Sequence, residues 1–575
     1  MRQPVWEGDG EPEYGLPRDG QDCRPRCGWL LLLLPALMLT IAGCTEPTDA
    51  DRAKALIETV LSARGRQRVE VTEAVLDLAE RRADAGDTKT AERIYRTLWD
   101  ASAAPDRRHV RCAAIRGLAR VRGPAAVEEV ATAMAGEDEQ VAAAALAAAA
   151  CAGGEDVTRA WADSLPSAPR AVRPKIVRVL GRRGGPVAEA AILAAVDSED
   201  GPLRRAAIEA AGRLATPRAV GPLVALLGAD DAGDRDAAEA ALAHLAGRGV
   251  SAAVAERLAE AMSAVPVERG GSPHPPRNEA THALGAAGPE THRAVSLIRV
   301  LAARAARGQA DAVAACLAGG PAEVQTAALE ALAVLGGPRH VPAVLGVLVE
   351  TANGEVREAA ETALTAIGTR SQTDRVVPQV VRAMEDAGPA GRCALLRVLG
   401  EAPTEVGLSA VRQAMRDEDE AVRLAAVRVA SAWPAAAPAP DLLAVAHEAE
   451  EAKVRILAVR GVIRLTGRME DPAARTRLLG RALAAAERVQ EKRLALAALA
   501  GVPAPEALAV ALSHMQEPSL VDEAAAAAVG VAEGIAETHP AEARRALEAV
   551  LESTEAARIR ERAGRLLGRL EEGGR

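Results

Sequence analysis

The sequence contains no Phe, and only two Tyr and five Trp among its 575 residues. Aromatic rings therefore cannot fill a hydrophobic core of ordinary size, and the core must be built from Ala, Leu and Val. Small side chains fill a core without voids only when the backbones that carry them approach closely. The lack of aromatic residues thus favours helices in close contact.

A strong excess of positive charge is also lacking. The chain has 70 Lys and Arg against 79 Asp and Glu, which gives a formal net charge of -9. Proteins that bind nucleic acid through its phosphates usually show a basic excess. We therefore expect no nucleic-acid partner.

The common signatures of catalytic sites are absent from the sequence. There is no phosphate-binding Gly-rich loop, no nucleophile elbow and no His-Glu-x-x-His motif. A single His-Glu dipeptide occurs, at His447-Glu448. We predict that the protein is not an enzyme, and that it has no catalytic, cofactor-binding or metal-binding residues.

One short helical pattern recurs through most of the chain. In its clearest copy, acidic residues at 417–420 precede Val422, Ala425, Ala426 and Val429, which are spaced to share one helical face. Acidic residues at a helix start cap free backbone N–H groups and oppose the helix dipole. Further copies open with a Val-Arg-like pair at 110, 172, 203, 324, 356 and 454, mostly spaced by roughly 31 to 35 residues.

A second helix fits between successive copies, as at 339–348, where Pro342 stands in the first turn. Each unit is then a pair of antiparallel helices. One pair cannot cover its own apolar side, whereas a stack of pairs can. The pattern predicts an all-α fold, an α-solenoid or superhelix of stacked antiparallel helix hairpins.

The Val-Arg-x-x-Ala-Ala-x-Ala-Leu-Gly pattern resembles HEAT repeats, in particular the short bacterial type named after phycobilin lyases. The resemblance covers about residues 105–570 and implies architecture rather than activity. HEAT-repeat deoxyhypusine hydroxylase binds iron through several His-Glu dipeptides, whereas this chain has one. An enzyme, or enzyme subunit, of this hydroxylase or lyase kind is the alternative to a non-catalytic scaffold.

The amino-terminal segment resembles a bacterial lipoprotein signal peptide. Arg24 and Arg26 precede an apolar run at 29–41, which has the length of a signal-peptide core. The run ends in Ile-Ala-Gly-Cys, similar to a lipobox, and this resemblance implies lipidation of Cys44. The long segment before Arg24 suggests a true start downstream of Met1. An ordinary cleaved signal or an uncleaved anchor is the alternative.

The predicted order of segments follows from these patterns. It is a signal peptide at 1–43, a tether at 44–50, tetratricopeptide-like or capping helices at 51–104, HEAT-like repeats at 105–433, a Pro-rich joint at 434–440 and HEAT-like repeats at 441–571. Residues 264–276 interrupt the repeat spacing and indicate an inserted loop. This loop is either a disordered addition to the fold or part of a binding site.

Arginines open many of the repeated helices. Arg357, Arg423 and Arg455 are candidates for binding an acidic protein surface, because the guanidinium fork matches a carboxylate. The alternative is a ladder inside the fold, in which each Arg reaches an acid of its own or the next repeat, such as Asp417 or Asp419.

Four cysteines lie beyond Cys44, at 112, 151, 316 and 393. Their Ala-rich helical surroundings predict small buried core residues, with a disulfide as the alternative. Together, the patterns predict a membrane-anchored lipoprotein on the extracytoplasmic side of the bacterial cell envelope. We expect it to bind an unidentified protein, and the sequence names neither the partner nor the membrane.

Overall fold

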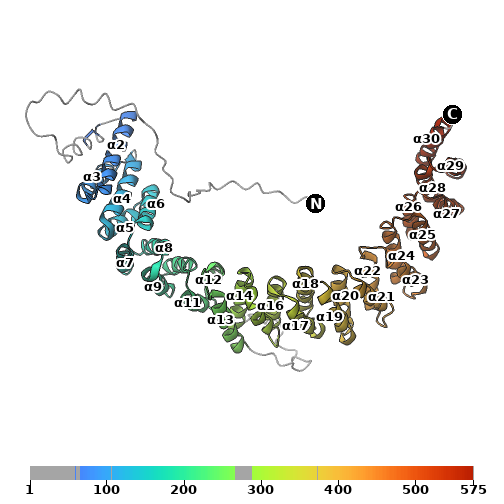
Figure 1. Ribbon diagram of the computed structural model, residues 1–575, viewed down its shortest axis with the longest axis horizontal. Helices are drawn as coiled ribbons and strands as arrows, with labels where there is room; N and C mark the ends of the chain where they lie inside the picture. Colours follow the sequence, from blue (N-terminus) through green and yellow to red (C-terminus); the bar gives the residue numbers. More distant parts are fainter. Residues whose placement is uncertain are drawn as a thin grey trace, which may run out of the picture. The chain divides into compact units, whose positions relative to one another are not determined.

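A computed structural model gives the fold of the chain. It describes residues 58–59, 62, 65–104, 107–265, 288–371 and 373–573. These residues form helices and connecting loops and contain no strand. The predicted all-α solenoid of stacked helix hairpins is confirmed (Figure 1).

The chain separates into two compact units, residues 1–117 and 118–575. Unit 1 contains α2 (Gly65–Asp84), α3 (Thr88–Ala101) and the first part of α4 (Arg108–Arg122). Asp87 caps α3 by accepting a hydrogen bond from the Thr90 N–H at 3.2 Å. The α3 side chains Ile94, Tyr95 and Leu98 are buried.

Unit 2 consists of helix hairpins. The first helices of the hairpins, called the odd layer here, are α5 (Val127–Ala135), α7 (Glu155–Ser164), α9 (Gly185–Val196), α11 (Val220–Leu226), α13 (Val250–Ala264), α15 (Ala310–Ala315), α17 (Val341–Glu350), α19 (Thr373–Asp386), α21 (Glu405–Ala414), α23 (Ala439–Glu448), α25 (Pro472–Ala485), α27 (Pro505–His514) and α29 (Pro540–Ser553). Short 3-10 turns precede four of them, at η2 (Gly123–Ala126), η3 (Pro217–Ala219), η4 (Arg307–Gln309) and η5 (Pro338–His340).

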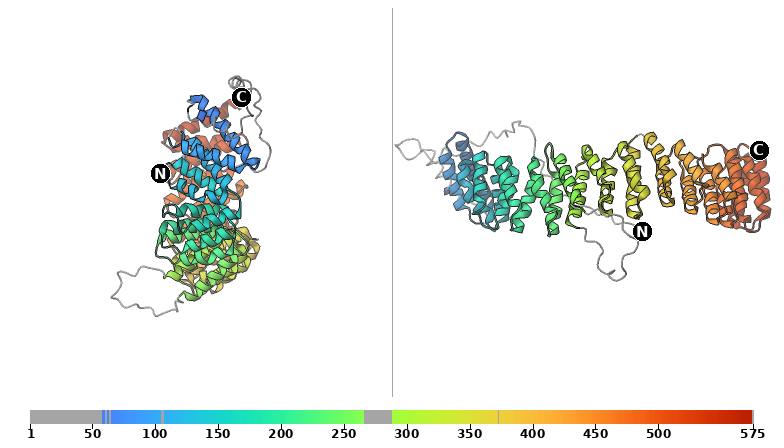
Figure 2. Two further views of the ribbon diagram at one scale, coloured as in Figure 1. Left: turned by 90° about the vertical axis from the view of Figure 1, so that its left-hand side faces the viewer. Right: turned by 90° about the horizontal axis from the view of Figure 1, so that it is seen from below.

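The second helices are called the even layer. They are α6 (Glu139–Cys151), α8 (Arg173–Arg183), α10 (Gly201–Ala211), α12 (Ala232–His244), α14 (Pro289–Ala303), α16 (Ala322–Leu335), α18 (Gly354–Arg370), α20 (Pro389–Glu401), α22 (Glu420–Ala432), α24 (Ala452–Thr466), α26 (Val489–Leu499), α28 (Val521–Ile535) and α30 (Ala557–Gly573). Within unit 2, each even-layer helix packs on its own hairpin partner and on the even-layer helices beside it, as Figures 1 and 2 show.

Helix α22 shows how the repeated pattern folds. The Asp419 carboxylate accepts hydrogen bonds from the backbone N–H groups of Ala421, at 2.9 Å, and Val422, at 3.1 Å, as the acidic start predicted. Val422 and Ala426 are buried as expected. The predicted face was wrong in part, since Ala425 and Val429 are only half-buried whereas Val427 is buried. The helix packs against α20, α21 and α24, so its buried surface is wider than one stripe.

Close approach between even-layer helices depends on glycine. Gly212, directly after α10, is buried, and a Cβ added there would lie 2.9 Å from the Cα of Ala241 in α12. Gly181 of α8 makes the same approach to α10, where an added Cβ would lie 2.9 Å from the Cβ of Ala210. Ala and Gly at these contacts let backbones meet without aromatic bulk, as the composition led us to expect.

Several sequence predictions fall outside the described residues. These are the signal peptide, Cys44 and most of the insertion after α13. The Pro-rich segment joins α22 to α23, and both helices pack against α24. Its role as a joint stays a prediction, as do the predicted segment boundaries. Among the described helices, none combines the length and the hydropathy that crossing a membrane requires.

Candidate interaction surface

The arginines that open even-layer helices close their own hairpins. Six of them, each the fourth residue of its helix, donate a hydrogen bond to the backbone carbonyl six residues earlier, in the loop that follows the first helix. The six are Arg204, Arg235, Arg357, Arg423, Arg455 and Arg560. A cation at these carbonyls also opposes the dipole of the preceding helix. The recurring Arg therefore has a role in the fold itself.

Three of these arginines also reach a carboxylate of the next repeat. Arg204 places Nε and Nη2 2.6 Å from one oxygen of Asp234. Arg423 pairs with Glu451, and Arg455 lies 3.1 Å from Glu487. The pairs join residues 28 to 32 apart in the sequence. The contacts match the ladder that the sequence left open, in which an Arg reaches an acid of the next repeat. Asp417 also takes part in it, because Arg392, the fourth residue of α20, lies 2.8 Å from its carboxylate.

The three predicted partner-binding arginines thus have acceptors inside the fold. Arg357 donates to the carbonyl of Thr351. Arg423 lines a cleft of about 310 Å³ together with Arg416 and three carboxylates, those of Glu448, Glu450 and Glu451. The pKa of the Glu451 carboxyl lies below its usual value, because its own backbone N–H and then Arg423 stabilise the charged form. Binding of a partner by Arg357, Arg423 and Arg455 stays a prediction.

A second set of arginines lies at the carboxyl ends of even-layer helices. Arg183 donates to the carbonyls of Ala149, at 2.9 Å, and Gly154, at 2.9 Å. Arg304 and Arg370 reach carbonyls at the end of the preceding even-layer helix in the same way. Burial lowers the pKa of all three guanidinium groups. These arginines cap the even-layer helix of the previous repeat, so their hydrogen bonds are made within the fold.

The even layer nevertheless exposes side chains at a fixed position. The opening position is the fourth residue of each even-layer helix, except in α8, where it is Arg173. Five residues after it, the side chain is exposed on each even-layer helix from α8 to α26 except α14. These residues are Arg178, Glu209, Ala240, Glu330, Thr362, Arg397, Arg428, Arg460 and Ala497. Because the helices stack side by side, the positions form one line across successive repeats.

Some charges on this line are paired and others are not. Arg397 binds both carboxylate oxygens of Glu361, at 2.6 and 2.8 Å, and Arg460 lies 2.7 Å from the buried Glu491. Arg428 has no ion-pair or hydrogen-bond partner for its side chain within the part of the chain that the structure describes. The same holds for Arg299, which is exposed on α14. The charge of Arg428 is therefore not neutralised by another described residue, and it lies on the exposed surface of the even layer.

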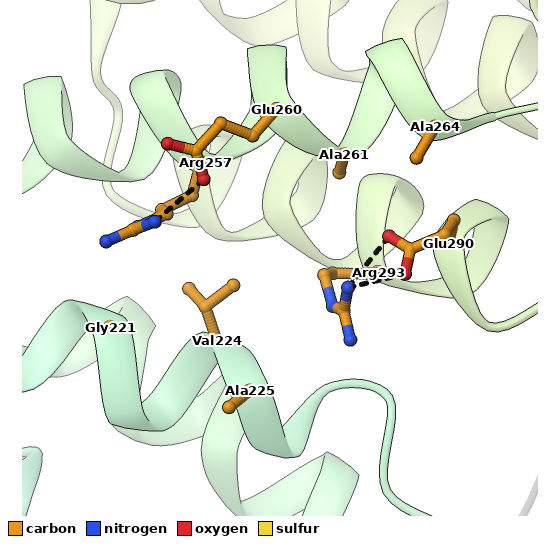
Figure 3. A pocket seen from close by; sticks show the side chains of 9 residues that line it. All are labelled: Gly221, Val224, Ala225, Arg257, Glu260, Ala261, Ala264, Glu290 and Arg293. Carbon is orange, nitrogen blue, oxygen red and sulfur yellow. Dashed lines mark hydrogen bonds and ion pairs between the residues drawn. The ribbon is translucent and has the colours of Figure 1, made fainter.

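A separate pocket of about 540 Å³ lies between α11, α13 and α14. Figure 3 shows two ion pairs in its lining, Arg257 with Glu260 and Arg293 with Glu290. The charged atoms of each pair lie 2.7 Å apart. Val224 and Ala261 belong to the apolar wall. Each cation is matched by an acid of its own helix, so the pocket has no excess charge. Its lining contains Arg and Glu side chains among small apolar residues, and no His, Cys or Ser.

The groups that metal or thiol chemistry would need lie apart. In the described ranges, no three His, Cys, Asp or Glu side chains lie together as metal ligands would. The prediction that the cysteines are buried is correct for Cys112 and Cys316, whereas Cys393 is half-buried. It is wrong for Cys151, which is exposed because it ends α6 beside a glycine-containing loop. No disulfide joins these four cysteines, and burial raises the pKa of Cys316 to about 11.

Comparison with known proteins gives a family match over part of unit 2. Residues 158–243 match HEAT repeats. This range runs from α7 through most of α12, where Arg204 and Arg235 make the contacts described above. A search of the curated proteins gives no match.

Solved helical-repeat structures resemble the chain in fold. Kap121p matches with a TM-score of 0.43 and 12% identity, and Kap121p bound to Nup53p matches with a TM-score of 0.44 and 12% identity. Each alignment covers 91% of this chain and 57% of Kap121p, so this chain spans little more than half of that protein. A homology model of the full-length AP-3 complex in an intermediate open conformation matches with a TM-score of 0.40 and 10% identity, and 91% of this chain and 93% of that chain are aligned.

Sequence reasoning selected the conspicuous arginines and missed the exposed ones. Arg428 is five residues after Arg423, at a position that only the stack shows to be free. A signal did exist in the sequence. The opening residue and the residue five later fall on different sides of a helix at 3.6 residues per turn, so both cannot face the same neighbour.

Proposed function

We propose that the protein is a non-catalytic scaffold that binds another protein along the even layer of unit 2. The observation that supports this proposal is the line of exposed side chains at one position of successive repeats. A stack of repeats extends such a line without enlarging a core, and solenoids use extended surfaces of this kind to bind partners. The HEAT-repeat match at residues 158–243 agrees with it.

The place of action proposed here is the bacterial cell envelope, on the extracytoplasmic side. Its support is the amino-terminal sequence alone, with basic residues, an apolar run and the lipobox-like Ile-Ala-Gly-Cys ending at Cys44. A lipid on Cys44 would hold the solenoid at a membrane surface. Replacing Cys44 with Ala should release the protein from sedimented membranes, and a variant that stays membrane-bound would remove the lipid anchor from the proposal.

Partner binding is tested by chemical cross-linking of membranes from the native cell, followed by purification of the tagged protein and identification of cross-linked peptides. We expect cross-links to one recurring protein through even-layer residues. Cross-links confined to the odd layer, or none under several conditions, would contradict the proposal. Metal analysis of the purified protein is the second measurement, because stoichiometric iron would favour an enzyme of the hydroxylase kind.

A further inference from the structure

One part of the even layer differs from the rest in its exposed side chains. At the first two positions after the opening residue, most even-layer helices carry polar or small residues, such as Thr326 and Ala327 in α16. Helices α22, α24 and α26 carry large aliphatic side chains there instead. Leu424, Ile456 and Leu457 are half-buried at these positions, and Leu494 is 47% exposed. Three successive helices thus share an apolar feature that the earlier repeats lack.

Unpaired cations border this apolar feature. Arg428 lies one turn beyond Leu424 on α22, and Arg464 lies two turns beyond Leu457 on the same side of α24. Both arginines are exposed, and their side chains have no partner among the described residues. Lys453 lies one turn before Leu457. Its side chain is also exposed and has no partner among the described residues. We call this surface the basic-apolar strip, and define it by Leu424, Arg428, Ile456, Leu457, Arg464 and Leu494.

The three helices of the strip lie next to one another. Helix α24 packs along α22, and α26 packs beside α24. Arg423 of α22 reaches Glu451 at the start of α24, and Arg460 of α24 reaches Glu491 of α26 at 2.7 Å. The aliphatic residues occupy the fifth or sixth position of each helix, counted from its first residue, so they lie at equivalent places on adjacent helices. The aliphatic residues therefore form a continuous row, and Arg428 and Arg464 lie along one edge of it.

We propose that the basic-apolar strip binds an acidic amphipathic helix of a partner protein. This inference rests on the proposed scaffold function and specifies the chemistry of the partner. The aliphatic row favours a helix face of large apolar residues, and the unpaired cations favour Glu and Asp on the flank of that face. An apolar partner without acids would leave these cations uncompensated, and a basic one would be repelled.

The spacing of the strip fits the pitch of a helix that crosses it. Packed helices have axes about 8–10 Å apart, and seven residues of an α-helix rise about 10.5 Å. A bound helix that runs across the strip would therefore place residues i, i+7 and i+14 over α22, α24 and α26 in turn. An occupant of about four turns is long enough to contact all three helices.

The test uses the full chain and a synthetic probe. The probe is a fluorescent peptide of about 18 residues with Leu at heptad spacing and Glu on the flanking positions, and its binding is followed by anisotropy. We expect saturable binding that weakens as salt is raised. The double variant Arg428→Glu, Arg464→Glu should bind at least tenfold more weakly, and Leu457→Ser should weaken binding to a similar degree.

The matched control reverses two other even-layer arginines. Arg182 and Arg299 are also exposed, and no side-chain partner for them is found in the described part of the chain, but no aliphatic row lies beside them. The variant Arg182→Glu, Arg299→Glu changes the net charge by the same amount and should bind the peptide within threefold of the parent protein. Equal losses in both double variants would overturn the proposal, as would equal binding of a peptide with Lys in place of Glu.

The remaining outcomes separate this inference from the scaffold proposal. Cross-links to a partner could map to other even-layer helices, and substitutions in the basic-apolar strip could leave peptide binding unchanged. In that case the inference about the strip fails and the scaffold proposal stands. If no partner is captured at any even-layer position, the scaffold proposal fails. A dimer in light scattering that the Arg428→Glu, Arg464→Glu variant dissociates would show that a second copy of the chain covers the strip, and would overturn the inference.

Discussion

The contact between Arg204 and Asp234 allows a quantitative test of the ladder between repeats. The side chain of Asp234 is 2% exposed, and Arg204 donates to one of its oxygens through two nitrogens at 2.6 Å. The other oxygen has no hydrogen-bond partner. In the variant Arg204→Leu, the carboxylate stays buried and loses its counter-charge. Removing one partner of a buried ion pair costs about 3–5 kcal/mol, and we expect about 3 kcal/mol here, because Arg204 is 23% exposed.

The reverse substitution should cost much less. Other repeats carry Val at the position of Asp234, for example Val356 and Val422, so Asp234→Val places an apolar side chain where the fold already accepts one. Arg204 would keep its hydrogen bond to the Ser198 carbonyl at 2.8 Å and could reach water. We expect a cost of about 1 kcal/mol or less for Asp234→Val. The double variant should lie within about 1 kcal/mol of the parent protein, which gives a coupling energy of about 2–3 kcal/mol.

The assay must report locally, because repeat arrays can unfold in parts. Hydrogen exchange measured on peptides that cover α10 to α12 gives the free energy of opening in that region, and urea unfolding gives the effect on the whole chain. The control is Arg205→Leu, which removes an exposed charge one residue away and should change stability by less than about 0.5 kcal/mol. Additive effects of the two substitutions, or no effect of Arg204→Leu, would refute the role given to this pair.

Three further predictions concern packing, pH and thiol reactivity. Gly212→Val should lower the free energy of unfolding, measured from the urea midpoint, by about 1–3 kcal/mol, because the new side chain meets the α12 backbone. Gly346→Ala should raise it by about 0.5–1 kcal/mol, because Gly346 lies inside α17 with open space around its Cα. The pKa of Glu451 is lowered in the folded protein, so its contribution to stability is present above its usual pKa of 4.5 and is lost as the pH falls through the folded value. The melting temperatures of the parent and Glu451→Gln should therefore differ at pH 7 and approach each other as the pH falls below 4.5, and a constant difference would contradict this assignment. Iodoacetamide at pH 8 should modify Cys151 in the native protein and leave Cys316 unmodified until urea is added, as peptide mass spectrometry would show, and early modification of Cys316 would contradict its burial.

Much of the fold follows from local patterns that the sequence displays. The acidic start and apolar spacing near Val422 predict a capped helix, and Asp419 makes the cap that they require. The repeat period predicts stacking, because no single hairpin covers its apolar side. The exact buried face, which includes Val427, could not be predicted, since α22 packs against helices of other repeats as well as against its own hairpin partner.

The candidate site was harder to predict, because pairing depends on distances between repeats. Arg423 and Arg428 are the same residue type on the same helix, yet one is bound by Glu451 and the other has no partner among the described residues. Their difference follows from which side of α22 faces α24 and which faces outward. The spacing of residues in one repeat does not contain this information, whereas the stack of helices does.

Photo-cross-linking in the native cell tests the central claim most directly. A photoreactive residue is placed at Leu457, in the basic-apolar strip, or at Val406, which is 51% exposed on α21 in the odd layer. The account predicts that the residue at Leu457 forms an adduct with one protein, whose cross-linked peptide is an acidic amphipathic helix, and that the residue at Val406 forms none. No adduct at Leu457, or the same adduct from both positions, would contradict it.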